Sequence, residues 1–267
     1  MSLQRFAGKV AVLTGSTQGI GLATAQRLGR EGCKVVVSSR RENNVQEAVD
    51  LLRKEGIEAS GVKCHQGAPE DRRNLIQHAL DTFGGFDCVF MSAGVNPHIG
   101  PLLTVKEKEF QKVFDINVKA NFMFIQECMP HLVKRGGGAI VTNATSAACD
   151  FGMAFVGQDI RLYTISKLAL AAMTNQVARD CYNQNVRVNC VLPGIIKTQF
   201  AEGGVGQKSY LDHLAAYGIN RNDLAAELGK PEEIGSVVAF LLSADAAYIS
   251  GECVACAGGM GPISHVF

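Results

Sequence analysis

The stretch KVAVLTGSTQGIGLATAQRLGREG, residues 9–32, decides the fold. It begins with an apolar run of strand length, passes through a glycine-rich turn and continues into a helical pattern. Alternating strands and helices with right-handed crossovers predict a single α/β domain over residues 1–267, a Rossmann-type doubly wound parallel sheet with helices on both faces. Further runs of strand length lie at 34–40, 59–67, 86–94, 138–146, 186–194 and 251–259.

The overall composition is that of an ordinary globular protein. Apolar residues make up 47% of the 267 residues and charged residues 19%, with a net charge of +1. We therefore expect no nucleic-acid partner and no membrane insertion. The nine cysteines are scattered, except that Cys253 and Cys256 lie three residues apart, and we interpret these two as strand or loop residues. We therefore expect reduced thiols, no metal site and a cytoplasmic location. A mitochondrial location stays open, and the C-terminal SHVF is not a Ser-Lys-Leu peroxisomal signal.

The glycine-rich turn lies between the first strand and the first helix, where parallel sheets bind phosphate groups. Glycines let the backbone approach a phosphate closely, and the helix N-terminus offers free N–H groups and a positive dipole end. In a strand–turn–helix unit, such a turn predicts a dinucleotide site. The residues that we expect to contact the dinucleotide here are Gly15, Ser16, Thr17, Gly19, Ile20 and Gly21.

The end of the second strand indicates which dinucleotide is bound. A site for NAD places a carboxylate here to bind the ribose 2′-hydroxyl, whereas this chain has SSRR at 38–41 and no carboxylate before Glu42. A guanidinium pairs with a 2′-phosphate through charge-assisted hydrogen bonds. The prediction is therefore NADP(H), bound mainly by Arg40 with help from Ser39 and Ser16. The alternative is that Arg40 is a solvated surface residue.

Tyr163 and Lys167 lie four residues apart in LYTISKLALAAMTNQVARD (162–180), a helical pattern without proline or glycine. Residues at positions i and i+4 share a helix face, so the phenol and the ammonium can point into one site. A nearby ammonium lowers the pKa of a phenol, which would make Tyr163 a usable proton donor near neutral pH. Taken alone, the same spacing is also typical of a solvated helix face.

Together, these motifs resemble those of the short-chain dehydrogenases/reductases over nearly the whole chain. TGSTQGIG (14–21) resembles the cofactor turn of that family, DINVKA (115–120) its active-site asparagine, and YTISK (163–167) its tyrosine and lysine. RVNCVLPGIIKT (187–198) resembles the segment that meets the nicotinamide, and YISGE (248–252) also fits. Segments such as VVVSSR and KCHQGAPEDR are similar to the NADP-dependent carbonyl and retinal reductases of the dehydrogenase/reductase member 4 group.

The resemblance implies an oxidoreductase that transfers hydride between NADP(H) and a carbonyl or secondary alcohol. Tyr163 would give its proton to the developing alkoxide, while a nearby hydroxyl would polarise that oxygen. Lys167 would lower the pKa of Tyr163 and bind the nicotinamide ribose, and Asn117 would connect Lys167 to a proton relay through its backbone and water. Further cofactor contacts are implied at His65, Ser92, Ala93, Gly94, Pro193, Gly194, Ile196 and Thr198.

Three positions depart from the family pattern. Ser92 stands where the family has the asparagine of Asn-Ala-Gly, and His65 stands where an aspartate commonly contacts adenine. The catalytic serine aligns with Thr145 when residues are counted without a gap, but Ser146 is the next residue. Adjacent strand residues face opposite ways, so one hydroxyl serves unless a bulge selects the other. Residue type slightly favours Ser146, and Thr145 is a nearly equal choice.

The surroundings of the site are predicted with alternatives. The glycine-rich segment 199–222 is interpreted as a substrate lid, or else as a surface loop with a short helix. The stretch 149–162 is longer than in the family and either shapes the pocket or forms an outward loop or subunit contact. Val95, Phe151 and Phe155 are candidates for an apolar wall, which suits a lipophilic ketone, aldehyde, dicarbonyl or retinoid.

Two further expectations concern assembly and activity. The family implies a homotetramer built on the central helices, although the long apolar helix near residues 110–133 could equally be internal core. The alternative to an active reductase is a cofactor-binding but catalytically weak subunit that acts as a scaffold or regulator.

Overall fold

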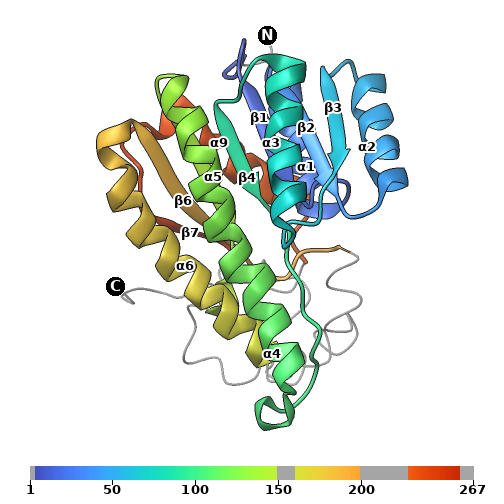
Figure 1. The fold of residues 1–267 in the computed structure, drawn as a ribbon, viewed down its shortest axis with the longest axis vertical. Helices are drawn as coiled ribbons and strands as arrows, with labels where there is room; N and C mark the ends of the chain where they lie inside the picture. Colours follow the sequence, from blue (N-terminus) through green and yellow to red (C-terminus); the bar gives the residue numbers. More distant parts are fainter. Residues whose placement is uncertain (1–3, 149–159, 199–227, 259–267) are drawn as a thin grey trace.

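The computed structural model describes residues 4–148, 160–198 and 228–258, and it confirms the predicted doubly wound sheet (Figure 1). Seven parallel strands lie in the order β3-β2-β1-β4-β5-β6-β7, so the direction of growth reverses between β1 and β4. Ligands of parallel sheets bind outside the carboxyl ends of the strands at such a reversal. The strands are β1 Val10–Thr14, β2 Lys34–Ser39, β3 Ala59–Lys63, β4 Cys88–Met91, β5 Gly138–Asn143, β6 Val186–Pro193 and β7 Cys253–Cys256.

Helices cover both faces of the sheet because neighbouring strand residues point to opposite sides. Ala11 and Leu13 of β1 belong to one buried cluster, which α1, α2 and α9 cover. Val10 and Val12 belong to a second cluster, which α3, α5 and α6 cover. The helices are α1 Gly19–Arg30, α2 Glu42–Lys54, α3 Pro69–Phe83, α4 Glu107–Phe114, α5 Ala120–Lys134, α6 Arg161–Cys181 and α9 Pro231–Leu242, with short helical turns η1 Leu102–Thr104, η2 Asp115–Lys119, η3 Ser146–Ala148, η5 Tyr182–Gln184 and η7 Ala244–Ala246.

The segment predicted as one long helix near residues 110–133 is two helices joined by a π-helical turn. Helix α4 ends at Phe114, the π-turn η2 follows, and α5 begins at Ala120. A π-turn inserts an extra residue into the turn and therefore rotates the side chains on either side of it relative to each other. The residue at the centre of this turn is Asn117, which is fully buried. The π-turn thus directs a polar side chain into the interior.

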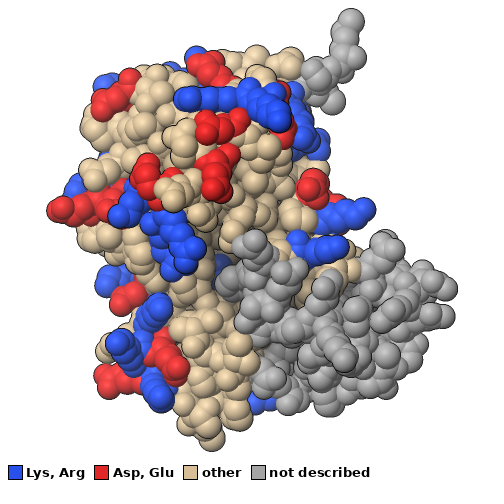
Figure 2. All heavy atoms as spheres, turned by 90° about the vertical axis from the view of Figure 1, so that its right-hand side faces the viewer, with Lys and Arg blue, Asp and Glu red and all other residues tan. Residues whose placement is uncertain are grey.

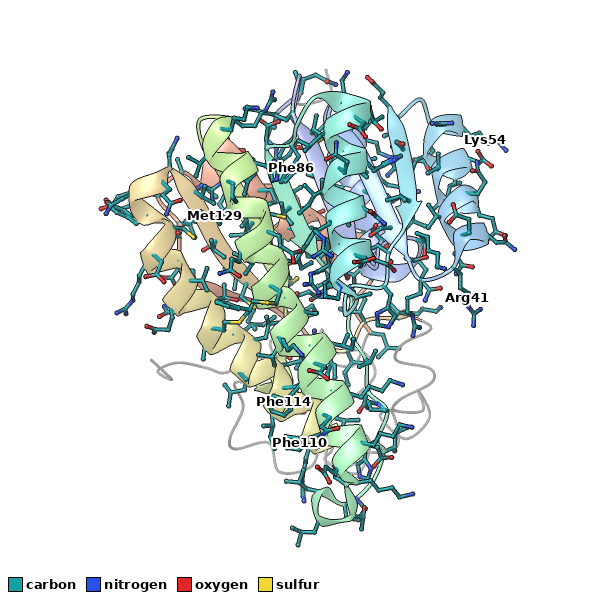
Figure 3. The ribbon with its side chains drawn as sticks, in the orientation of Figure 1. Arg41, Lys54, Phe86, Phe110, Phe114 and Met129 are labelled. Carbon is teal, nitrogen blue, oxygen red and sulfur yellow. The ribbon has the colours of Figure 1, made fainter. Side chains whose placement is uncertain are left out.

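The two faces of this helix pair differ. Phe124 and Leu132 of α5 are fully buried in the core, which confirms the alternative that the segment is partly internal. On α4, the ring of Phe110 stacks on that of Phe114 with centroids 4.7 Å apart. In Figure 3 this pair lies at the lower end of the molecule, whereas Phe86 lies near the upper end. Phe110 is nevertheless 49% exposed, so the outer face of the helix pair keeps apolar surface.

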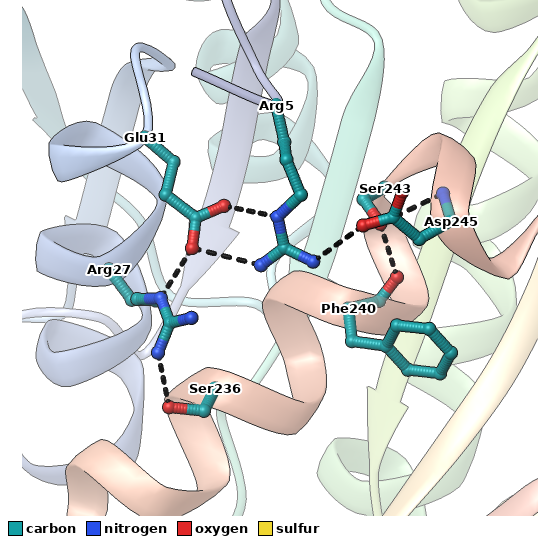
Figure 4. A network of polar contacts seen from close by, with 7 residues as sticks. All are labelled: Arg5, Arg27, Glu31, Ser236, Phe240, Ser243 and Asp245. Atoms are coloured by element: carbon teal, nitrogen blue, oxygen red, sulfur yellow. Dashed lines mark hydrogen bonds and ion pairs between the residues drawn. The ribbon is translucent and has the colours of Figure 1, made fainter. Parts of the chain in front are cut away.

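A network of ion pairs holds Arg5, near the start of the chain, at the amino ends of the strands (Figure 4). This edge of the sheet lies opposite the carboxyl ends. Arg5 donates to both carboxylate oxygens of Glu31, at 2.6 and 2.9 Å, and to Asp245 in η7 at 2.9 Å. Arg27 also pairs with Glu31 and donates to Ser236 of α9. Because Glu31 is 6% exposed, its charge depends on these two guanidinium groups. The network therefore joins α1 to α9.

The surface carries charges of both signs. On the side of the molecule that Figure 2 presents, Lys and Arg side chains alternate with Asp and Glu rather than forming one large patch. This distribution agrees with the net charge of +1. Within the described ranges, no helix is both long enough and apolar enough to cross a membrane.

Candidate active site

The glycine-rich turn after β1 is shaped by two left-handed glycines and a close contact with the segment after β4. Gly15 and Gly19 have φ angles of +59° and +54°, a region that side-chain-bearing residues rarely adopt. A Cβ atom on Gly15 would lie 2.8 Å from the backbone N and Cα of Ala93. A Cβ atom on Gly21 would overlap the carbonyl of Gly15. These glycines give a bare backbone turn at the N-terminus of α1, as a pyrophosphate site requires.

Ser16 does not play the part that the sequence predicts for its side chain. The residue is fully buried, and its hydroxyl donates to the carbonyl of Leu13 at 2.9 Å. The same oxygen accepts the backbone N–H of Ser38 at 3.0 Å, so it ties the end of β1 to β2. A buried hydroxyl with both roles taken is not placed to help Arg40 bind a 2′-phosphate. A contribution of Ser16 to cofactor binding stays a prediction.

Basic side chains gather at the carboxyl ends of β2 and β3. Arg40 and Arg41 are exposed, and Ser39 pairs in register with the exposed Lys63. Arg41 is the N-cap of α2 and gives it no side-chain cap, so the first N–H groups of this helix stay available to an anion. Figure 3 shows Arg41 at one end of α2 and Lys54 at the other. Among the described residues, none forms an ion pair with Arg40 or Arg41.

His65 lies next to this basic edge. It is exposed, and its backbone N–H donates to the carboxylate of Asp71 at 2.8 Å. His65 thus lies just beyond the carboxyl end of β3, where the resemblance implies the adenine. Arg41 and Lys63 are added to the residues predicted to contact the cofactor at this edge. Their only signal in the sequence is their position, because Arg41 follows closely after β2 and Lys63 is the last residue of β3.

Asn117 holds the segment after β4 against helix α6. Its side-chain oxygen accepts the N–H of Val95 at 2.8 Å, and its amide nitrogen donates to the Val95 carbonyl at 2.9 Å. The same nitrogen donates to the hydroxyl of Ser166 at 2.9 Å. Its peptide carbonyl, which the π-turn draws out of the regular helix ladder, accepts the amide of Asn121 at 2.8 Å. Asn117 is therefore a structural clamp between three elements.

Lys167 is the buried charge of the site. Its side chain is 2% exposed and donates from Nζ to the carbonyl of Asn143 at 2.5 Å. A Cβ atom on Gly94 would lie 3.2 Å from this Nζ, so the absence of a side chain at Gly94 makes room for the ammonium. Burial lowers the pKa of Lys167 to about 8, and the nearby thiol of Cys190 opposes this shift. The lysine can therefore lose its charge within about one pH unit of neutral pH.

Tyr163 lies one helical turn before Lys167 on the same face of α6. The Lys167 Nζ is 5.6 Å from the centroid of the Tyr163 ring, which confirms that the two side chains lie together. Burial raises the pKa of the Tyr163 phenol, which is the opposite of the predicted direction. The sequence pattern shows the neighbouring ammonium but not how far the fold removes the phenol from water, and this desolvation is the cause of the raised pKa.

The two candidate hydroxyls after β5 differ in their surroundings. The Thr145 hydroxyl is turned toward β6, with its oxygen 3.5 Å from the carbonyl of Pro193 as a long hydrogen bond. Ser146 begins the short turn η3, is 7% exposed and makes no hydrogen bond with another described residue. Of the two hydroxyls, that of Ser146 is therefore the one without a backbone partner among the described residues.

The segment after β6 closes the site on the side of the glycine turn. Gly194 donates its N–H to the carbonyl of Cys256 at 3.0 Å, and Ile196 pairs with Gly229 in an isolated bridge. A Cβ atom on Gly19 would lie 3.1 Å from the Thr198 methyl group, so Thr198 packs against the start of α1. The structure thus brings Thr198 to the glycine turn, whereas Phe151, Phe155 and the segment 199–222 lie outside the described residues.

Lys167→Met is expected to change how the stability depends on pH. Between about pH 8 and 10.5 the unfolded state holds a proton on Lys167 that the folded state has lost, so the wild-type free energy of unfolding rises with pH. Below this window, burial of the charge costs the folded state on the order of 3 kcal/mol. Urea denaturation at pH 7 and pH 10 should show the wild type gaining stability relative to the variant. A difference that is independent of pH would contradict the buried ammonium.

The whole chain was also compared with known proteins. The family model described as enoyl-(acyl carrier protein) reductase matches residues 15–261. The chain belongs to the short-chain dehydrogenase/reductase family, which consists of oxidoreductases that use nicotinamide cofactors. This result confirms the family that the motifs indicate.

Individual relatives cover almost the full length. Dehydrogenase/reductase SDR family member 4 of Oryctolagus cuniculus is 43% identical over 253 residues, which are 95% of this chain and 94% of that protein. Tropinone reductase-like 3 of Erythroxylum coca is 40% identical over 261 residues, with coverage of 96% and 94%. Among solved structures, L-sorbose reductase from Gluconobacter frateurii complexed with NADPH and L-sorbose has a TM-score of 0.83 at 28% identity, covering 97% of this chain and 98% of that one.

Proposed function

We propose that this protein is an NADP(H)-dependent carbonyl reductase that acts on a lipophilic ketone, aldehyde, dicarbonyl or retinoid. The observation that carries the proposal is that Lys167, which lies beside the Tyr163 ring, also packs against Gly94. The residue before Gly94, Ala93, packs on the glycine turn. An acid/base pair and a backbone phosphate cradle therefore meet at the carboxyl ends of β1, β4 and β5. The names of the relatives in this family support a carbonyl or alcohol substrate.

The residues of this chain fit the task of preparing a carbonyl for reduction. A bound nicotinamide would supply the hydride. Because its pKa is raised, Tyr163 keeps its proton at neutral pH and can donate it to the alkoxide oxygen as that oxygen becomes basic. Lys167, charged below about pH 8, would bind the nicotinamide ribose and stabilise negative charge on the Tyr163 oxygen after the donation. The second lone pair of the Asn117 carbonyl would hold the relay water.

The site residues also fit the phosphates of NADP(H). The bare turn at Gly15 and Gly19 leaves room for a pyrophosphate, and the α1 N-terminus offers its N–H groups. At the adenosine end, Arg40 and Arg41 offer guanidinium groups next to the uncapped start of α2. A ribose 2′-phosphate is the group of the cofactor that such an edge would recognise.

Arg40→Ala is expected to weaken binding of NADPH by about tenfold to a hundredfold, because a charge-assisted hydrogen bond contributes about 1.5–3 kcal/mol. Binding of NADH, which lacks the 2′-phosphate, should change little. Lys54→Ala is the matched control, since it removes one positive charge from the opposite end of α2. Because the chain contains no tryptophan, both affinities are measured from the fluorescence of the reduced nicotinamide as each cofactor is titrated with protein. Equal losses for NADPH and NADH would contradict the assignment of Arg40.

Ser146→Ala is expected to lower kcat by about a hundredfold, as for the loss of one donor to a developing oxyanion. Thr145→Val should lower kcat by less than about tenfold, because the Thr145 hydroxyl is turned toward the Pro193 carbonyl. Steady-state kinetics of both variants separate the two candidates. If Thr145→Val causes the larger loss, Thr145 is the catalytic hydroxyl.

The direct test of the proposal is a substrate panel. Ketones, aldehydes, α-dicarbonyls, quinones and retinal are offered to the wild-type protein with NADPH and with NADH, and consumption of the reduced cofactor is followed. The proposal expects turnover of at least one class, faster with NADPH. NADPH binding without consumption across the panel would instead support the cofactor-binding, catalytically weak subunit.

The proposed assembly is a homotetramer, and the proposed compartment is the cytoplasm. Phe110, Phe122 and Ile165 on α4, α5 and α6 are between 41% and 49% exposed, which supports burial of this surface between subunits. Light scattering after size exclusion would measure the assembly, and a monomeric mass would contradict it.

A further inference from the structure

Asn143 is a polar residue at the end of an otherwise apolar strand, and it contacts the site twice. It is the last residue of β5 and is 8% exposed. Its peptide carbonyl accepts the buried Lys167 ammonium at 2.5 Å. Its side-chain amide nitrogen donates to the hydroxyl of Ser92, at the end of β4, at 3.4 Å. One residue therefore connects the buried charge of the site to the neighbouring strand.

The segment that Asn143 contacts through Ser92 carries the rest of the site. We call residues 92–94 the Ser92–Gly94 run. Ala93 packs on the glycine turn at Gly15, and Gly94 packs on the Lys167 ammonium. Just beyond the run, Val95 is held by two hydrogen bonds to Asn117. At the start of the run, Ser92 is held by two hydrogen bonds. Its N–H donates to the Thr14 carbonyl at 3.2 Å, and its hydroxyl accepts from the Asn143 side-chain amide.

The side-chain oxygen of Asn143 does not contribute to the stability of the fold. Its side-chain oxygen is buried and has no hydrogen-bond partner in the described parts of the chain. A buried acceptor without a partner costs about 1–3 kcal/mol, and the single long bond to Ser92 contributes about 1 kcal/mol at most. A leucine, which has the same number and branching of side-chain heavy atoms, would avoid this cost. Stability alone therefore does not favour asparagine at this position.

We propose that Asn143 is a positioning residue of the proposed reductase site. Its side chain fixes the start of the Ser92–Gly94 run, and its peptide carbonyl fixes Lys167, so that the phosphate cradle and the acid/base pair keep a constant separation. Ser92 and Asn143 act as one unit in which a side-chain amide of one strand meets a hydroxyl of the next. This role rests on the proposed function, and it makes two predictions that a purely structural role does not make.

The first prediction is that activity and stability change in opposite directions. Asn143→Leu is expected to weaken NADPH binding and to lower kcat, each by about tenfold, because the Ser92–Gly94 run loses its anchor on β5. The thermal midpoint should be unchanged or higher, since the unpaired oxygen is removed. Thr142→Val is the matched control, because Thr142 is the preceding residue and its hydroxyl lies 2.8 Å from that of Thr174. It should leave affinity and kcat within about twofold.

The second prediction is rescue by exchange. The double variant Ser92→Asn with Asn143→Ser places the amide on β4 and the hydroxyl on β5, which keeps an amide–hydroxyl pair at the same place. It should recover NADPH affinity and kcat to within about threefold of the wild type, whereas Asn143→Ser alone should not. Thermal melts, fluorescence titration with NADPH and steady-state kinetics are measured on every variant.

The outcomes separate this inference from the proposed function. If the wild type binds NADPH but reduces no carbonyl, the proposed function fails while the affinities still test Asn143. Unchanged NADPH affinity in Asn143→Leu would overturn the inference. A fall in affinity that is accompanied by a lower thermal midpoint, and that the double variant does not rescue, would overturn it as well. If the wild type binds neither NADPH nor NADH, both the function and the inference are wrong.

Discussion

Tyr163→Phe is expected to lower kcat by about a thousandfold while leaving the dissociation constant of NADPH within about twofold of the wild type. The substitution removes only the phenolic oxygen, which is the proton donor in the proposed reaction. The phenylalanine ring would keep the packing that places the Tyr163 ring 5.6 Å from the Lys167 Nζ. Steady-state kinetics with the best substrate of the panel, and fluorescence titration with NADPH, measure the two effects separately.

Tyr182→Phe is the matched control for this experiment. Tyr182 is 78% exposed in the short turn η5, so the loss of its hydroxyl should leave kcat unchanged. If Tyr163→Phe keeps more than about a tenth of the wild-type turnover, another group supplies the proton and the assignment of Tyr163 is wrong.

Gly15→Ala is expected to abolish measurable NADPH binding and to destabilise the protein by about 2–4 kcal/mol. The new methyl group would lie 2.8 Å from the backbone N and Cα of Ala93, and backbone atoms of a packed segment have little freedom to move. The φ angle of +59° adds strain of its own. Relief of the clash would separate the glycine turn from the Ser92–Gly94 run, which is the contact that brings the phosphate cradle to the acid/base pair.

Gly84→Ala separates the clash from the strain. Gly84 has a φ angle of +75° at the end of α3, but a Cβ atom there would meet nothing within 4 Å. This control should cost about 1 kcal/mol from the left-handed backbone alone and leave NADPH binding intact. Gly15→Ala with the same small loss, and with normal NADPH affinity, would show that the contact with Ala93 is not what shapes the site.

The strands and their order follow from the sequence because each is a short apolar run between helical patterns, and right-handed crossovers leave few ways to arrange them. The π-turn at residues 115–119 does not follow, because the apolar pattern continues through it without a proline or glycine. The turn is stabilised by tertiary bonds of Asn117 with Val95 and Ser166, which involve residues distant in sequence. Such bonds leave no local signal.

The candidate site, like the fold, could be predicted from the sequence only in part. The family resemblance implies that Gly94, Asn117 and Lys167 gather at one site, and in the structure they lie together at one edge of the sheet. Burial depends on the whole fold, so the sequence did not show that the Ser16 hydroxyl is buried in the turn, and the predicted direction of the Tyr163 pKa shift was wrong because desolvation raises that pKa. Asn143 was overlooked, although a polar residue at the end of an apolar strand is a signal that can be read.

The most direct measurement of the central claim is transfer of deuterium from the cofactor. NADPH labelled with deuterium at C4 of the nicotinamide, in each of its two stereochemical forms, is incubated with the wild-type protein and the best carbonyl substrate. One labelled form is expected to place a deuterium on the carbinol carbon of the alcohol, in step with NADPH consumption, and Tyr163→Phe should slow this transfer. Product without deuterium from either form, or NADPH that is bound and never consumed, would contradict the claim.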